Sequence, residues 1–249
     1  MAIDGVVAVV GATGRQGGAA AKALLAAGAE VRALVRDPAK AAAAAVQAAG
    51  AQLVVADFDQ PDTVDAALQG ASRVFAMTTM DSGRGTEGET ADGILLADAA
   101  KRASVEDLVY TSVGGAERHT GVPHFESKRR VEEHIERLGI PATFVRPTFF
   151  YENLLGQPPA VEDGSIVVRM PFPDGIALQM VAVDDIGIVA AAAILDPHRV
   201  PKGAVEIAGD ELTGSEIPAT FGRLAWKPAR YEALPLDAAP DGDRRAMFA

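Results

Sequence analysis

The sequence predicts an α/β protein built on a doubly wound parallel sheet, followed by a small, less regular C-terminal lobe. Short apolar runs rich in β-branched residues, such as residues 6–10, are typical of strands buried on both faces of a parallel sheet. These runs alternate with helical patterns from residue 5 to about residue 146. This alternation predicts repeated βα units, and therefore parallel strands with helices on both faces of the sheet.

A glycine-rich turn joins the first expected strand to the first expected helix. The apolar run ends at Gly11, and an alanine- and leucine-rich helix follows and stops at Gly28. Glycines let the backbone turn tightly and approach a ligand, and the first N–H groups of the helix favour an anion there. A dinucleotide pyrophosphate is the usual occupant, and a glycine turn without a ligand is the alternative. The residues expected to bind in this turn are Gly11, Thr13, Gly14, Arg15, Gln16 and Gly17.

The glycine spacing in this turn is G-x-x-G-x-x-G, whereas the commoner fingerprint is G-x-G-x-x-G. Further strands are expected at residues 30–35, 53–56, 73–77, 108–111 and 142–145. Further helices are expected at residues 38–49, 61–68, 89–103 and 125–138. Pro61 suits the first turn of its helix, and Gly50 and Gly139 follow helix ends. Residues 81–88 and 114–123 are expected to be loops.

The pattern changes after Arg146, where five prolines interrupt regular structure up to Pro173. Strands are expected at 166–170, 204–207 and 231–234, and helices at 213–225 and from Asp184 or Asp185 to Ala193. We therefore divide the chain into a dinucleotide-binding region, residues 1–150, and a small substrate lobe, residues 151–249, packed together as one unit.

Composition excludes several classes of function. The 249 residues carry a formal net charge of -11, which disfavours a general nucleic-acid surface. The chain has no cysteine, so disulfides and thiol nucleophiles are excluded. The four histidines lack metal-ligand spacing, and no metal site is expected. The first residues do not read as a signal peptide, and no apolar run reaches membrane-spanning length, so a cytoplasmic protein without a membrane partner is expected.

Several stretches together resemble the NmrA-like branch of the atypical short-chain dehydrogenase/reductases. They are VVGATGRQGG, VRALVRDPAK, YTSVGGAE, HFESKRRVEEHIERLGIPATFVRP and FYENLL, with VDDIG near residues 183–187 and the C-terminal RAMFA. The HFESK and ENLL segments are more specific to this branch than the glycine motif. The resemblance implies a Rossmann-type fold and a bound nicotinamide dinucleotide, usually NADP(H). It leaves the activity open, because the branch contains redox-sensing regulators as well as reductases of quinones and other small substrates.

The end of the second strand bears on the choice of dinucleotide. An NAD site places a carboxylate there to accept from the ribose hydroxyls. Here Arg36 offers a bidentate fork for a 2′-phosphate, and Lys40 adds a second cation. Both match the phosphate clamp that the resemblance implies, and Arg15 supplies a third positive charge nearby. We expect NADP(H), with Asp37 as the basis of the NAD alternative.

Other expected cofactor contacts lie at the carboxyl ends of strands, where ligands of this sheet type bind. Asp57 and Phe58 resemble the family's adenine-side residues. Met77, Thr78 and Thr79 are expected beside the ribose and pyrophosphate. Residues 147–150 follow the sixth strand, and their backbone, at Pro147 and Phe149 above all, is expected to face the nicotinamide. The aromatic residues 149–151 either line a planar pocket or pack as core of the lobe.

The family's catalytic pair is kept only in part. A typical short-chain dehydrogenase donates a proton from tyrosine in Tyr-x-x-x-Lys, but here His124 stands four residues before Lys128. That offset puts both side chains on one helical face. Ser112 matches the family's serine. Tyr110 is expected to be a core or edge residue of its strand and not a substitute donor.

Three interpretations of this pair remain. In the first, Lys128 only holds the nicotinamide ribose and the protein binds cofactor without turnover. In the second, hydride transfer proceeds with His124, Lys128 or water supplying a proton, which a histidine can do near neutral pH. In the third, which is compatible with either of the others, His124 is a loop residue capping the helix that starts near Phe125.

Two hypotheses about function follow. The leading one is an NADPH-dependent reductase of small, flat electrophiles such as quinones. The other is a non-catalytic redox sensor that binds NADP(H) and a regulatory protein. A homo-oligomer is compatible with both, and neither needs direct contact with nucleic acid.

Overall fold

The computed structural model describes residues 5–196, 198–239 and 242–248. Within these ranges the chain forms two compact units. The first contains the residues up to Thr120, His124–Pro147 and Val183–Ile207; the second contains Gly121–Pro123, Thr148–Ala182 and the residues from Ala208 on. The sequence analysis divides the chain near residue 150, where it leaves the first unit, but residues 183–207 return to that unit.

The first unit is organised around a seven-stranded sheet in the order β11-β6-β5-β4-β1-β2-β3. Its strands are β1 (Val6–Val10), β2 (Val31–Val35), β3 (Gln52–Val55), β4 (Ala71–Ala76), β5 (Asp107–Thr111), β6 (Ala142–Pro147) and β11 (Gly203–Ile207). All six neighbouring pairs are parallel. The chain winds outward in opposite directions from β1, so the strand order reverses between β1 and β4. In such sheets ligands bind at the carboxyl ends of the strands beside this point.

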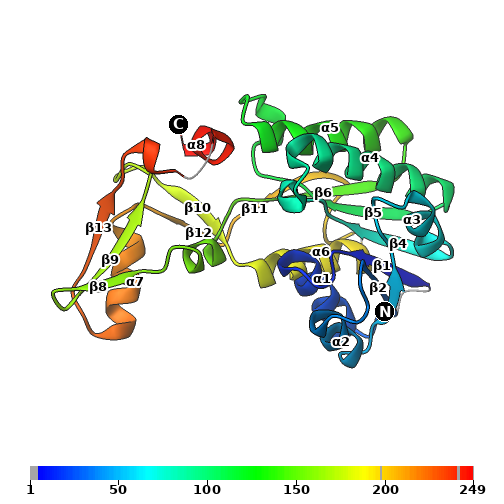
Figure 1. Cartoon of the computed structure of the whole chain (residues 1–249), viewed down its shortest axis with the longest axis horizontal. Helices are drawn as coiled ribbons and strands as arrows, with labels where there is room; N and C mark the ends of the chain where they lie inside the picture. Colours follow the sequence, from blue (N-terminus) through cyan, green and yellow to red (C-terminus); the bar gives the residue numbers. More distant parts are fainter. Residues whose placement is uncertain (1–4, 197, 240–241, 249) are drawn as a thin grey trace. The chain divides into compact units, whose positions relative to one another are not determined.

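Helices cover both faces of this sheet, as the sequence predicts (Figure 1). They are α1 (Arg15–Ala26), α2 (Ala41–Ala48), α3 (Pro61–Leu68), α4 (Gly85–Arg102), α5 (Pro123–Leu138) and α6 (Val183–Leu195), with the short 3-10 turns η1 (Met80–Ser82) and η2 (Ala116–Arg118). Helices α1 and α6 lie on one face, and α4 and α5 on the other. Val7, Ala8 and Val9 of β1 are fully buried between the two layers.

Small residues bring α1 and α6 close together. A Cβ atom added to Gly187 of α6 would lie 2.4 Å from the carbonyl carbon of Ala19 in α1. Near the exposed end of this contact, the Lys22 ammonium lies 2.9 Å from the Asp184 carboxylate. The VDDIG segment therefore forms the start of a helix that packs on the helix following the glycine turn.

The predicted loop at residues 81–88 is wrong in its second half, because α4 already begins at Gly85. Composition favours a loop there, since glycine and polar residues dominate. A tertiary ion pair reverses this preference: Arg84 donates two hydrogen bonds, of 2.5 and 2.7 Å, to the buried Asp92 carboxylate two turns along the helix. Gly88 leaves room for this arginine, because a Cβ there would lie 2.2 Å from the Arg84 Cβ.

Two predicted helix starts are also corrected. The helix expected from residue 38 begins at Ala41, because the Asp37 carboxylate accepts a hydrogen bond of 2.9 Å from the Ala39 N–H and holds a turn. In the second unit, the helix expected from residue 213 is α7 (Glu216–Ala225). There the Glu216 carboxylate accepts bonds of 2.8 Å from both the N–H and the hydroxyl of Thr213.

The second unit contains two three-stranded sheets, ordered β12-β10-β7 and β13-β9-β8. Its strands are β7 (Phe149–Phe150), β8 (Ala160–Glu162), β9 (Ser165–Met170), β10 (Leu178–Val181), β12 (Asp210–Leu212) and β13 (Ala229–Ala233). Its helices are α7 and α8 (Gly242–Phe248), with the 3-10 turns η3 (Tyr151–Leu155) and η4 (Leu236–Ala238). Its core forms around Val168, Met170, Met180 and Ile217. Strands near residues 166 and 231 are confirmed, whereas β7, β8, β10 and β12 are additions to the prediction.

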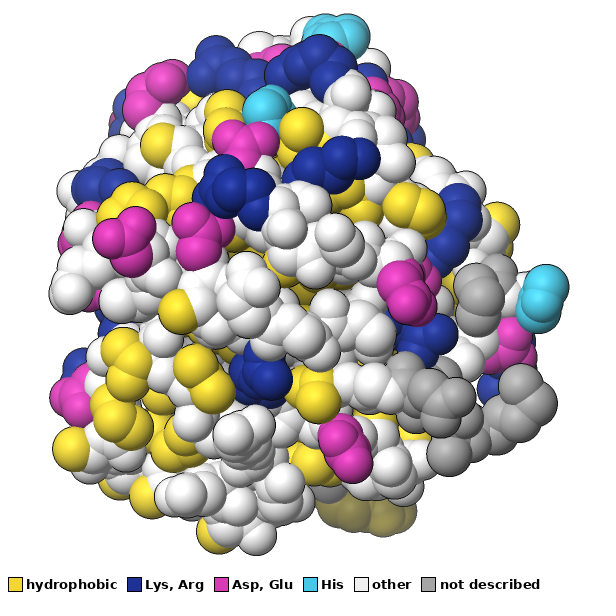
Figure 2. Space-filling model, turned by 90° about the vertical axis from the view of Figure 1, so that its right-hand side faces the viewer, with side chains coloured by type: hydrophobic (Ala, Val, Ile, Leu, Met, Phe, Trp, Pro, Cys, Tyr) yellow, Lys and Arg dark blue, Asp and Glu magenta, His cyan; other side chains and the backbone are white. Residues whose placement is uncertain are grey.

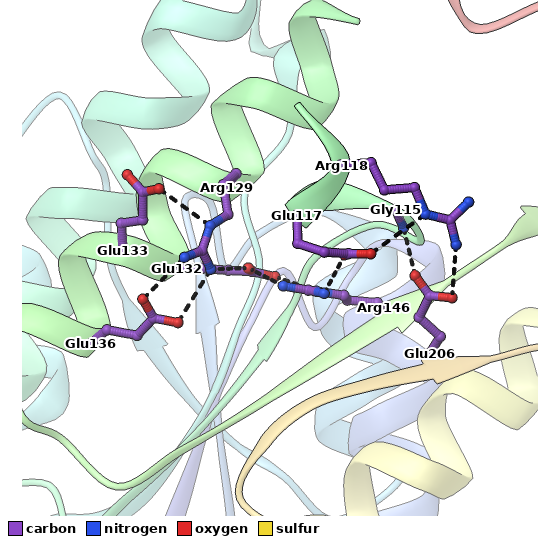
Figure 3. A network of polar contacts seen from close by, with 9 residues as sticks. All are labelled: Gly115, Glu117, Arg118, Arg129, Glu132, Glu133, Glu136, Arg146 and Glu206. Carbon is purple, nitrogen blue, oxygen red and sulfur yellow. Dashed lines mark hydrogen bonds and ion pairs between the residues drawn. The ribbon is translucent and has the colours of Figure 1, made fainter. Parts of the chain in front are cut away.

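A buried ionic network ties the helix α5 to the end of β6 (Figure 3). The Arg146 guanidinium donates to both oxygens of the Glu132 carboxylate, at 2.9 and 2.6 Å. Its remaining nitrogen donates to the Glu117 carboxylate. Glu132 is fully buried and also accepts from Arg129 at 2.9 Å. The Glu206 carboxylate of β11 accepts a 2.7 Å bond from the N–H of Gly115, which lies on the loop after β5. The network thus holds the segment after β5 against β6 and β11.

No helix within the described ranges is long and apolar enough to cross a membrane. On the face of the molecule in Figure 2, acidic and basic side chains are interspersed among polar and apolar ones. This mixture gives that face no single-sign field of the kind that nucleic-acid-binding surfaces present.

Candidate dinucleotide site

The glycine turn connects β1 to α1 in a conformation that requires two of its glycines. Gly11 has φ +67°, and a Cβ there would lie 2.4 Å from the Met77 sulfur. A Cβ at Gly17 would lie 2.3 Å from the Gly11 carbonyl oxygen, so this glycine lets α1 pack directly on the turn. The Gly14 N–H closes the turn with a 2.8 Å bond to the same carbonyl oxygen. The turn thus brings the start of α1 to the carboxyl end of β1.

The start of α1 is suited to an anion. Gly14 occupies the N-cap position, no side chain caps the helix, and its first turn contains no acidic residue. Thr13, Gly14 and Arg15 are exposed there. The N–H groups of a first helical turn lack partners within the helix and carry the positive end of its dipole. Gln16 is anchored instead, since its side-chain oxygen accepts a 2.6 Å bond from the Thr111 hydroxyl at the end of β5.

A hollow lies beside this turn, at the end of β2. It is lined by Thr13, Val35, Arg36, Asp37, Lys40 and Ala42. Among the described residues, neither Arg36 nor Lys40 has an ion-pair partner, whereas the Asp37 carboxylate is used in the turn to Ala39. Two exposed cations beside an engaged carboxylate suit a phosphate better than a ribose diol. The structure therefore brings Thr13 of the glycine turn together with the two residues expected to clamp a 2′-phosphate, whereas Arg15 is not among the residues that line the hollow.

The expected adenine-side and ribose-side residues follow β3 and β4. The Asp57 carboxylate accepts from the Asp59 N–H at 3.1 Å and from the Gln60 side chain at 3.3 Å, so it shapes its own turn. Phe58 and Met77 are partly buried against the core. Thr79 is exposed, and its hydroxyl accepts from the Asp81 N–H to cap η1.

Lys128 lies in a buried polar cluster formed by α4, α5, β5 and the segment after β4. Its ammonium donates to the Thr78 carbonyl oxygen at 2.6 Å and lies 2.9 Å from the Glu89 carboxylate. It also stands over the Tyr110 ring, 5.3 Å from the ring centre. The other Glu89 oxygen accepts a 2.5 Å bond from the Ser127 hydroxyl. Each of these residues is less than a tenth exposed.

This environment determines the charge of Lys128. Burial alone would lower the pKa of the ammonium, but Tyr110 and Glu89 beside it outweigh burial and raise that pKa above its ordinary value. Burial also raises the pKa of the Tyr110 phenol, whose oxygen lies 3.2 Å from the Thr78 hydroxyl. Near neutral pH the cluster therefore contains a charged lysine and a neutral tyrosine. Tyr110 is a core residue of β5, as expected.

Ser112 and His124 occupy different settings. Ser112 follows β5, is 5% exposed, and its hydroxyl has no hydrogen-bond partner among the described residues. A buried hydroxyl without a partner is costly unless a ligand or water supplies one. His124 lies within the first turn of α5, which begins at Pro123, so it does not cap the helix from a preceding loop. Its half-buried ring meets the Phe125 ring edge-on at 4.6 Å between centres.

Pro147 and Phe149 belong to different units. Pro147 ends β6, and its carbonyl oxygen accepts a 2.9 Å bond from the Gly114 N–H. Phe149 lies in the second unit, where its ring packs on the core around Met180, 6.4 Å from the Phe248 ring. Within its own unit, Phe149 is thus a partly buried residue packed against the core.

Glu89, which the sequence pattern indicates only as the start of a helix, is a member of the cluster that was not predicted. One signal could have found it. Glu89, Gly93, Leu96 and Ala100 share one face of α4, and all four are buried. A carboxylate that continues an otherwise small and apolar helical face indicates a buried partner. That partner lies 39 residues away, on α5.

Comparisons with known proteins place the chain among relatives of both expected kinds. It is 31% identical to an NAD(P)H azoreductase of Xenophilus azovorans over 235 residues, 94% of this chain and 79% of the relative. It is 30% identical to the nitrogen metabolite repression protein nmr of Neurospora crassa over 168 residues, 61% of this chain. The match covers only 34% of that regulator's length.

The fold and the family of the chain also match known proteins. The fold matches an NADPH-dependent quinone oxidoreductase of Escherichia coli, QOR2, crystallised with NADPH, with a TM-score of 0.81 and 25% identity. That match covers 97% of this chain and 86% of the other. The model of the NmrA-like family matches residues 4–243. The Rossmann-type fold is therefore confirmed, and the chain belongs to the NmrA-like family.

Proposed function

We propose that this protein binds NADP(H) and is an NADPH-dependent reductase of small, flat electrophiles such as quinones. The observation that carries the proposal is the hollow beside the glycine turn, where Arg36 and Lys40 lie next to the uncapped start of α1. Two relatives support it: the azoreductase is named for NAD(P)H, and the quinone oxidoreductase was crystallised with NADPH.

The residues present fit a nicotinamide dinucleotide. The first turn of α1 would hold the pyrophosphate through its N–H groups, because Gly11, Gly14 and Gly17 keep side chains out of the turn. Arg36 and Lys40 would hold the 2′-phosphate. Lys128 would donate to the nicotinamide ribose, and the unpartnered Ser112 hydroxyl supplies a further polar group at the end of β5.

For hydride transfer to a quinone, the protein has to position the cofactor and supply charge beside it. NADPH, when bound, supplies a hydride. Lys128 presents a fixed positive charge, and its raised pKa makes it a poor proton donor near neutral pH. His124, one helical turn before Lys128 on α5, is the remaining candidate for proton transfer. A quinone suits this arrangement because its reduced product is a stable anion, so the proton need not arrive with the hydride.

A redox sensor is the second candidate. It is favoured by the histidine that replaces the usual catalytic tyrosine and by the similarity to a nitrogen metabolite repression protein. The sensor would use the same cofactor contacts and would differ in having no turnover.

Arg36→Ala tests the cofactor assignment. The variant should bind NADPH more weakly by about 1–3 kcal/mol, the scale of a charge-assisted hydrogen bond, and should bind NADH nearly as well as the wild type does. Isothermal titration of both cofactors measures the difference. Arg199→Ala is the matched control, because this exposed arginine lies in the same unit and pairs only with Asp196 among the described residues. Equal losses for NADPH and NADH would show that Arg36 does not contact the 2′-phosphate.

A further inference from the structure

We infer that Glu89 is a positioning residue of the cofactor site: its buried carboxylate fixes the Lys128 ammonium so that one N–H group remains for the nicotinamide ribose. This inference rests on the proposed function, since it concerns how Lys128 reaches the cofactor. Neither the sequence pattern nor the family resemblance assigns a role to Glu89.

The geometry accounts for the donors of the ammonium. Lysine has three N–H donors. One is directed to the Thr78 carbonyl oxygen at 2.6 Å and one to Glu89 at 2.9 Å. The Tyr110 ring lies against the ammonium with its π face, 5.3 Å away. The Lys128 side chain keeps 10% of its surface exposed, so the cluster does not enclose it completely, and we assign the third donor to the ribose.

Charge compensation explains why an acid is needed at residue 89. An ammonium that is buried without a partner tends to lose its proton, because burial disfavours the charged form. Glu89 is the acidic side chain that faces Lys128. The other groups around it are the carbonyl of Thr78, two residues after the end of β4, the neutral Tyr110 of β5 and Ser127 of its own helix. The Ser127 hydroxyl donates a hydrogen bond to the second Glu89 oxygen. Every polar atom of the carboxylate is thereby satisfied, which holds it in one orientation.

The arrangement implies different roles for two residues of α5, Lys128 and His124. With Glu89 in place, Lys128 remains a charged hydrogen-bond donor throughout the neutral and mildly alkaline range and does not exchange its proton with substrate. Proton transfer, where it occurs, is left to His124 or water.

Glu89→Gln tests this assignment, because it keeps the shape of the side chain and removes its charge. The first readout needs no cofactor. The chain has six lysines, so side-chain NMR can follow each ammonium through a pH titration, with Lys128 identified by its absence in Lys128→Met. In the wild type Lys128 should titrate above the other lysines. In Glu89→Gln it should titrate at a lower pH than in the wild type, because only Tyr110 then opposes the effect of burial.

The second readout is the NADPH dissociation constant. In Glu89→Gln it should rise ~tenfold between about pH 7 and pH 9.5 as Lys128 loses its charge, and in the wild type it should stay nearly constant. The same substitution in the Lys128→Met background should have no such pH dependence. Glu87→Gln is the matched control: it lies two residues away on α4 but is exposed and pairs with Arg130.

The outcomes are distinguishable. If the wild type binds NADPH but Glu89→Gln leaves both the Lys128 titration and the pH profile unchanged, the positioning role is wrong and the proposed function stands. If the wild type does not bind NADPH, both fail. Should Glu89→Gln not fold, Ser127→Ala takes its place, because it frees one Glu89 oxygen without touching Lys128. It should shift both readouts in the same direction by a smaller amount, and no shift would overturn the inference.

Discussion

Replacing Arg146 with methionine should lower the free energy of unfolding by about 3 kcal/mol. The reason is the charge that the variant leaves behind. Glu132 is fully buried, and Arg146 supplies two of its hydrogen bonds (Figure 3). Arg129 still reaches Glu132, which keeps the loss at the lower end of the range for a broken buried pair. Urea denaturation followed by circular dichroism measures the change.

Two further variants show whether the loss of stability comes from the buried charge on Glu132 or simply from removing an arginine. Arg130→Met removes an exposed arginine from α5, the helix that carries Glu132. Its ion pair with Glu87 is open to solvent, so this substitution should change the free energy of unfolding by less than about 0.5 kcal/mol. The double substitution Arg146→Met with Glu132→Leu should recover most of the loss, because it removes both buried charges. A double variant as unstable as Arg146→Met would refute the account of the network.

His124→Phe should reduce turnover about 100-fold and leave the NADPH dissociation constant nearly unchanged. This loss is the scale expected when a general acid is removed. His124 shares a helical face with Lys128, one turn before it, whereas Glu132 on the same face is fully buried and paired with Arg146. The raised pKa of Lys128 makes the lysine itself a poor proton donor. Steady-state rates with a quinone and a separate titration of NADPH measure the two quantities.

The control for this substitution is His198→Phe, which changes an exposed histidine between α6 and β11. It should have the activity of the wild type. If His124→Phe also keeps the wild-type rate, the proton comes from water, and His124 has only a structural place at the start of α5.

The sequence predicted the first unit well where the information is local. Val6–Val10 and the glycines after it could be interpreted directly, because a doubly buried strand must be apolar and the turn at Gly11 and Gly17 excludes side chains. The hollow at Arg36 and Lys40 lies where the end of the second strand led us to expect it.

The prediction failed where contacts between residues far apart in the sequence determine the structure. The helix α4 starts at Gly85 because Arg84 pairs with Asp92, a contact that composition cannot reveal. Glu89 was missed since its partner Lys128 lies on another helix. The strands β8 and β12 are three residues long and offer too few residues for an alternating pattern. The return of residues 183–207 to the first unit likewise depends on packing of α6 against α1, through Gly187.

The central claim, an NADPH-dependent reductase, is tested most directly by following the loss of NADPH absorbance with a panel of quinones and azo compounds. The account predicts turnover with at least one quinone, lower activity with NADH, and a loss of that preference in Arg36→Ala. Tight NADPH binding without turnover across the whole panel would contradict it and favour the redox sensor.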